Sequence, residues 1–96
     1  MTLETMQWDA ATHLKTAEDI ALYLEAAFED GTPSVITAAL GDVARAQGMT
    51  RIAKEAGVTR EALYKALSDR GDPKLTTLLG LFNALGLHLS LKPQVK

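Results

Sequence analysis

A run of basic, hydroxyl-bearing and aromatic residues lies between Thr50 and Ser68, alternating with small and apolar ones. An arginine can bind guanine or phosphate through two N–H groups, a tyrosine ring can contact a thymine methyl group, and hydroxyl and ammonium groups can bind phosphate. These residue types therefore predict a DNA-binding surface. Its candidate residues are Thr50, Arg51, Lys54, Thr59, Arg60, Glu61, Tyr64, Lys65 and Ser68.

These side chains suit different contacts with a duplex. Arg60 can read guanine or clamp a phosphate, and Tyr64 offers a hydroxyl group and a flat ring to a base edge. Glu61 can accept a hydrogen bond from cytosine, or it can merely form an ion pair with Arg60 or Lys65 on the protein surface. Phosphate contacts are expected from Arg51, Lys54 and Lys65. The alternative for the whole set is an ordinary solvated face, because basic residues on short helices are usually inert.

Two short helices, at about 50–56 and 59–68, would have to position these residues. Helices that cross steeply after a short turn need a small residue at the contact, a residue that tolerates positive φ at the turn, and apolar residues behind them. Ala53 and Gly57 meet the first two needs, and Thr59 is placed to cap the second helix. The apolar positions are Ile52, Val58, Leu63 and Leu67. This pattern is typical of a helix-turn-helix.

The remaining sequence also predicts helices, so the expected fold class is all-α, a five-helix Cro/repressor-like domain with an N-terminal helical extension. N-cap residues and terminal glycines place further helices at about 17–30, 32–48 and 73–86. We expect one domain made of an N-terminal helical segment (1–31), a helix-turn-helix core (32–86) and a C-terminal tail (87–96).

The tail has the alternation of a short β-strand. Leu87, Leu89 and Leu91 alternate with polar residues, which is strand spacing. Such a strand has no ladder partner within this sequence, so it would pair with a second copy of the chain or with another protein's sheet. The alternative is a tail that packs its leucines on the core and pairs with nothing. We favour pairing in a homodimer, with these three leucines as the dimerisation residues.

Composition excludes several classes of function. With 96 residues, 47% of them apolar, the chain is long enough for one core. It has no cysteine, its two histidines have no companion ligands, and it lacks a phosphate-binding loop and any nucleophile motif. We therefore expect no metal, no cofactor and no enzymatic activity. The N-terminus lacks the pattern of a signal peptide and the longest apolar segment is too short for a bilayer, which favours a cytoplasmic protein without membrane contact.

Charge is unevenly distributed along the chain. Residues 1–48 carry eight acids against two bases, residues 49–74 six bases against four acids, and residues 75–96 two bases and no acid. The formal net charge of −2 therefore hides an acidic first half and a basic second half. This asymmetry favours an anionic partner for the second half.

From about Asp9 to Leu89 the chain resembles the HigA-like addiction module antidotes, small antitoxins with an XRE-type (Cro/repressor-like) helix-turn-helix domain. The matching segments are "DAATHLKTAEDIALYLEAAFEDGTP", "ALGDVARAQGMTRIAKEAGVTREALYKALS" and "GDPKLTTLLGLFNALGLHL". The resemblance implies an antitoxin that neutralises a RelE/HigB-like toxin and represses its own operon as a dimer bound to operator DNA. It also implies that the recognition helix carries the DNA contacts, here Thr59, Arg60, Glu61, Tyr64 and Lys65.

The resemblance does not identify the residues that would contact a toxin. We infer that acids of the first half do so, since they would attract a basic RNA-binding protein: Glu18, Asp19, Glu25, Glu29 and Asp30. The alternative is a solvated helix face. Two other functions stay open, a stand-alone XRE-type transcriptional repressor without a toxin, and a protein-interaction module whose helix-turn-helix has lost DNA binding.

Overall fold

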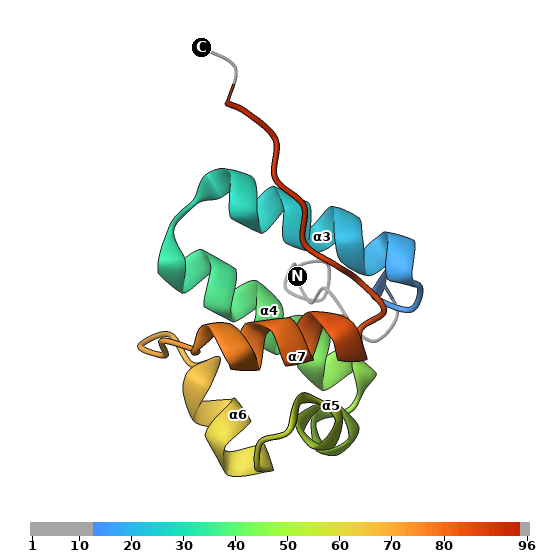
Figure 1. The fold of residues 1–96 in the computed structure, drawn as a ribbon, viewed down its shortest axis with the longest axis vertical. Helices are drawn as coiled ribbons and strands as arrows, with labels where there is room; N and C mark the ends of the chain where they lie inside the picture. The colour runs from blue at the N-terminus through green and yellow to red at the C-terminus, as the bar shows by residue number, and fades with distance from the viewer. Residues whose placement is uncertain (1–12, 95–96) are drawn as a thin grey trace, which may run out of the picture.

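The computed structural model describes residues 13–94, and this part of the chain is all-helical, as predicted. Its five helices are α3 (Ala17–Asp30), α4 (Pro33–Gln47), α5 (Met49–Ala56), α6 (Arg60–Ala66) and α7 (Leu75–Ala84). Figure 1 shows α3 in the upper part of the helical body, α5 and α6 in the lower part and α7 crossing between them, while the C-terminal tail runs past α3 to the top. The helices α3 and α6 therefore lie on opposite sides of the helical body.

The start of α3 follows from a local signal in the sequence. Thr16 has extended backbone angles, its hydroxyl accepts from the Asp19 N–H at 3.0 Å, and the Asp19 carboxylate accepts from the Thr16 N–H at 3.4 Å. This reciprocal pair satisfies two N–H groups that the first turn leaves unbonded. Gly31 ends the helix with φ 81°, a left-handed conformation that favours glycine. Both predicted ends of α3 are confirmed.

The start of α4 is confirmed and that of α7 is wrong by two residues. Pro33 is the first residue of α4, where its missing N–H costs no hydrogen bond, although the Thr32 side chain makes no capping bond. The last helix begins at Leu75 with Lys74 as its extended N-cap, and not at Pro73 after Asp72. The reason is that the φ angle of proline fits an extended chain as well as a first helical turn, so Pro73 alone does not mark the start.

One hydrophobic cluster takes side chains from every described helix. Ile20 of α3, Val43 of α4, Ile52 of α5, Leu63 of α6 and Leu81 of α7 are all buried in it. Neighbouring helices in the chain pack on one another, α3 on α4, α4 on α5 and α5 on α6, while α7 packs back on α5. The two short helices α5 and α6 are therefore held by tertiary contacts, as helices of this length require.

The C-terminal tail forms no strand in the described part of the single chain. Leu87 packs against the core, whereas Leu89 is 47% exposed and Leu91 is 98% exposed. A strand needs a ladder partner, and residues 13–94 provide none. Pairing of this segment with a second copy stays a prediction.

Candidate nucleic-acid interface

The connection between α5 and α6 is three residues long and is closed by backbone hydrogen bonds. Gly57 has φ 79° and ψ 25°, and its N–H donates to the Lys54 carbonyl at 3.2 Å. The Val58 N–H donates to the Ala53 carbonyl at 3.0 Å, so two carbonyl groups at the end of α5 are bonded. The Thr59 hydroxyl then accepts from the Ala62 N–H at 3.0 Å and caps α6. The predicted roles of Gly57 and Thr59 are confirmed.

Two close backbone contacts fix the position of these helices. A Cβ atom added to Gly80 of α7 would lie 2.9 Å from the Ala56 carbonyl oxygen at the end of α5. A Cβ atom added to Gly71 would overlap the carbonyl group of Ala66 at the end of α6. Since backbone atoms cannot move aside as the end of a flexible side chain can, both positions require glycine. Sequence reasoning assigned no role to either of them.

The outer side of α6 and the turn that follows it carry five of the nine predicted candidate residues. Helical periodicity places Arg60, Glu61, Tyr64, Lys65 and Ser68 on one side, and all of them are exposed, with Tyr64 at 42%. The opposite side carries the buried residues Leu63 and Leu67. The structure therefore leaves the polar side of α6 uncovered within the described chain.

Arg60 joins the beginnings of α5 and α6. Its Nη1 lies 3.4 Å from the Thr50 hydroxyl, its Nη2 lies 3.5 Å from the Tyr64 hydroxyl, and its guanidinium carbon lies 5.5 Å from the centre of the Tyr64 ring. The hydrogen bond to Tyr64 raises the pKa of Arg60 above its ordinary value, so the group stays cationic. Thr50, Arg60 and Tyr64 therefore form one cluster, which we call the Arg60 cluster.

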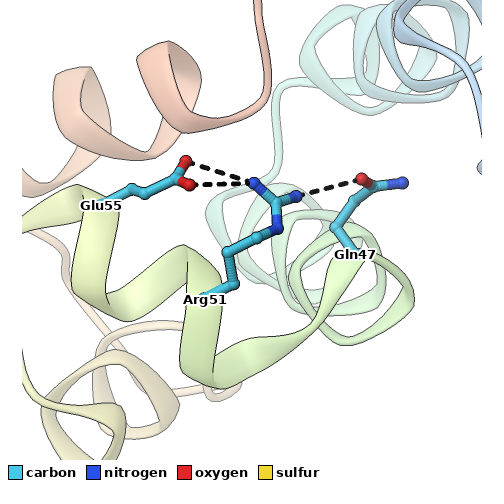
Figure 2. A network of polar contacts seen from close by, with 3 residues as sticks. All are labelled: Gln47, Arg51 and Glu55. Atoms are coloured by element: carbon cyan, nitrogen blue, oxygen red, sulfur yellow. Dashed lines mark hydrogen bonds and ion pairs between the residues drawn. The ribbon is translucent and has the colours of Figure 1, made fainter.

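Arg51 does not belong to the Arg60 cluster. Figure 2 shows its side chain between Glu55 and Gln47. Its Nη1 lies 3.2 Å from both carboxylate oxygens of Glu55, and its Nη2 donates to the Gln47 side-chain oxygen at 3.3 Å. Its charge is thus shared with a carboxylate on its own helix. Among the predicted phosphate contacts, the structure separates Arg51 from the others.

A basic groove continues the surface beyond the end of α6. It has a volume of about 570 Å³ and lies between the end of α6, the loop 67–74 and the first turn of α7. Three of its lining residues are basic, Lys65, Arg70 and Lys74, and one is acidic, Asp72. Ser68 and Thr77 add hydroxyl groups. Sequence reasoning missed Arg70, Lys74 and Thr77; the only signal was the spacing of the three bases, which the loop brings to one groove.

The acids that we predicted to contact a toxin fall into two groups on α3. Asp19 belongs to the cap of α3, and the Asp30 carboxylate accepts from the Thr32 N–H at 3.2 Å. Both therefore have local structural roles. Glu18, Glu25 and Glu29 are exposed, and they make no hydrogen bond or ion pair within the described chain.

Other kinds of site are not assembled in this part of the molecule. Among residues 13–94, no three His, Asp or Glu side chains come together as metal ligands. None of the helices described is both long and apolar enough to cross a bilayer.

Comparison with known proteins gives a family. A family model described as "Probable addiction module antidote protein" matches residues 4–93. An uncharacterised protein of Haemophilus influenzae is 41% identical over 92 residues, which cover 96% of this chain and 95% of the relative. No solved structure matches the chain.

Proposed function

This chain belongs to the family of probable addiction module antidote proteins, and from that premise we propose that it is a non-enzymatic antitoxin that also binds DNA. In this proposal it neutralises a RelE/HigB-like toxin and represses its own operon. Helices α5 and α6 act as a Cro/repressor-like helix-turn-helix, in which α6 is the recognition helix.

The observation that carries the DNA-binding part is the exposed polar side of α6. Arg60, Tyr64 and Lys65 are all uncovered there, whereas Leu63 of the same helix and Leu67 directly after it are buried. Contacts with Thr50 and Tyr64 hold the Arg60 guanidinium near the beginning of α6. A recognition helix reads base edges mainly with its first turns, so this is the position at which a guanine-binding arginine is useful.

The surrounding residues supply contacts of a second kind, to phosphates. Four basic side chains are available for this: Lys54 on α5, Lys65 on α6, and Arg70 and Lys74 in the following loop. Such contacts give affinity without sequence preference, and their number sets how steeply binding falls with salt. Arg51 can join them only by leaving Glu55. Because one copy offers few basic side chains, we propose that a homodimer places two α6 helices on half-sites about 34 Å apart.

The test measures binding to the DNA upstream of the protein's own gene. Fluorescence anisotropy with a labelled duplex compares the wild type with the double variant Arg60→Ala, Lys65→Ala. We expect about 100-fold weaker binding, because a base contact and a phosphate contact are lost together. The control is Lys15→Ala, Lys92→Ala, which removes the same charge from exposed positions outside α5 and α6 and should bind like the wild type.

Equal binding by the wild type and the α6 variant would contradict the recognition-helix assignment. DNA binding by a chain whose neighbouring gene encodes no toxin would instead favour the stand-alone repressor.

A further inference from the structure

An open groove of about 450 Å³ lies between α3 and α4, and all of its lining residues come from these two helices. Small side chains line most of it, Ala26 and Ala27 from α3 and Ala38 and Ala39 from α4. Val35 also lines it and is 42% exposed. Because these side chains are short, the side chains of a partner can approach both helices closely and gain dispersion contacts there.

The two largest polar side chains of this groove, Tyr23 and Asp42, bond to one another. The Tyr23 hydroxyl donates to an Asp42 carboxylate oxygen at 2.7 Å, and the other oxygen of Asp42 accepts from Arg45 at 2.7 Å. These bonds join α3 to α4 at one side of the groove and leave its remaining lining mainly apolar. This small apolar surface can accept an apolar side chain of a partner.

A row of glutamates runs along the outer side of α3, where Leu22 and Glu29 are one helical turn from Ala26 of the groove. Glu18, Leu22, Glu25 and Glu29 are spaced four, three and four residues apart, which places them in one line on the helix. Leu22 is 67% exposed in the middle of this row. The three carboxylates have no cationic partner within the described chain. An exposed leucine among unpaired glutamates suits an apolar side chain that is flanked by bases.

We propose that the α3–α4 groove and its glutamate row bind a cationic amphipathic segment of the toxin, and that the protein can hold this segment while bound to DNA. The proposal rests on the proposed antitoxin function. Charge selects the occupant: a nucleic acid would be repelled by the row, and a second copy docked on the same face would bring two glutamate rows together. A protein segment with Lys or Arg on either side of apolar side chains fits both the row and the groove.

Simultaneous binding follows from the positions of the two surfaces. Figure 1 shows α3 on the opposite side of the helical body from α6, with α7 between them. A partner on α3 therefore does not cover the outer side of α6.

The probe is the purified product of the gene next to this chain's own gene. Isothermal titration calorimetry compares the wild-type chain, Val35→Asp and the double variant Glu25→Lys, Glu29→Lys. Val35 is the third residue of α4, where an acid is favourable to the helix, so Val35→Asp should fold. We expect Val35→Asp to weaken binding about 30-fold. The charge reversal should weaken it about tenfold and reduce its dependence on salt.

The matched control is Leu75→Asp. Leu75 is 66% exposed, against 42% for Val35, and it is the first residue of α7, where an acid is again favourable. It should bind the probe like the wild type, and circular dichroism should report the same helix content for every variant. Val35→Asp and the charge-reversal variant, both outside the proposed DNA surface, should retain wild-type DNA binding; Leu75→Asp lies next to Lys74 and serves as a control for probe binding alone.

The outcomes separate the two levels of the proposal. If the wild type binds the probe and Val35→Asp and Glu25→Lys, Glu29→Lys bind it equally well, the assignment of the α3–α4 groove is wrong and the antitoxin function stands. If saturating probe displaces the wild type from DNA, simultaneous binding is wrong. If the wild type does not bind the probe at all, the toxin partnership and the groove both fail. Loss of binding in the groove variants alone, with a stable complex of probe, chain and DNA, supports the proposal.

Discussion

The α3–α4 pair and the α5–α6 pair use small residues in opposite ways. In α3 and α4, Ala26 and Ala38 are exposed and leave an open groove between the helices. At α5 and α6, Gly80 and Gly71 lie against the backbones of the two helix ends. In the first region small residues leave a groove that a partner can enter, and in the second they allow two backbones to pack in direct contact. The short helices are held rigidly, which suits a surface that must match the fixed geometry of a duplex.

The largest expected effect concerns the close contact of α7 with α5. Gly80→Ala should lower the free energy of unfolding by about 1–3 kcal/mol, because the new Cβ atom meets the Ala56 backbone. The matched control is Gly41→Ala in α4, where the nearest atom, at 3.2 Å, is Nη1 at the flexible end of Arg45, and the nearest backbone atom, the Leu67 carbonyl oxygen, is 3.4 Å away. That variant should be as stable as the wild type or more stable by up to about 1 kcal/mol, since alanine favours helix. Urea unfolding measures both.

A smaller effect is expected at the bond that joins α3 to α4. Tyr23→Phe removes the 2.7 Å hydrogen bond to Asp42 and should lower the free energy of unfolding by about 1 kcal/mol at neutral pH. If Gly41→Ala costs as much as Gly80→Ala, or if Tyr23→Phe costs more than Gly80→Ala, the contrast between the two regions is wrong.

The same tyrosine gives the α3–α4 pair a dependence on alkaline pH. Burial, followed by the hydrogen bond to Asp42, raises the pKa of Tyr23 to about 12 from its ordinary value of 10. The folded state therefore holds the phenolic proton more tightly than the unfolded chain. Its contribution to stability is complete below pH 10 and is lost as the pH rises toward 12. Stability measured over this interval should fall more steeply for the wild type than for Tyr23→Phe, and parallel curves would contradict the assignment.

Local signals account for the part of the fold that the sequence could predict. The Thr16 cap, Pro33 at the start of α4 and the positive φ of Gly57 depend on residues within one or two turns. The same holds for the exposed side of α6, because the buried leucines Leu63 and Leu67 define the other side by periodicity alone. These features need no knowledge of distant contacts.

The features that sequence reasoning missed depend on contacts between elements. The start of α7 could not be located from Pro73, since the path of the loop depends on how closely Gly71 approaches α6. The basic groove needs Arg70 and Lys74 to fold back beside α6. The engagement of Arg51 with Glu55 is a different case, because it is an i,i+4 pair within α5 whose spacing is already present in the sequence.

The most direct test of the account maps both surfaces on one sample. Amide ¹H–¹⁵N spectra of the labelled chain are recorded while the upstream duplex is added, and then while the neighbouring gene's product is added to the complex. We expect the duplex to shift the signals of residues 50–68 and 70–77 and to leave Ala17–Asp30 unchanged. The second addition should then shift α3 and α4 without restoring the free signals of α6. Shifts in α3 on adding DNA, with α6 unaffected at saturation, would contradict the assignment of DNA binding to α6 and of toxin binding to α3 and α4.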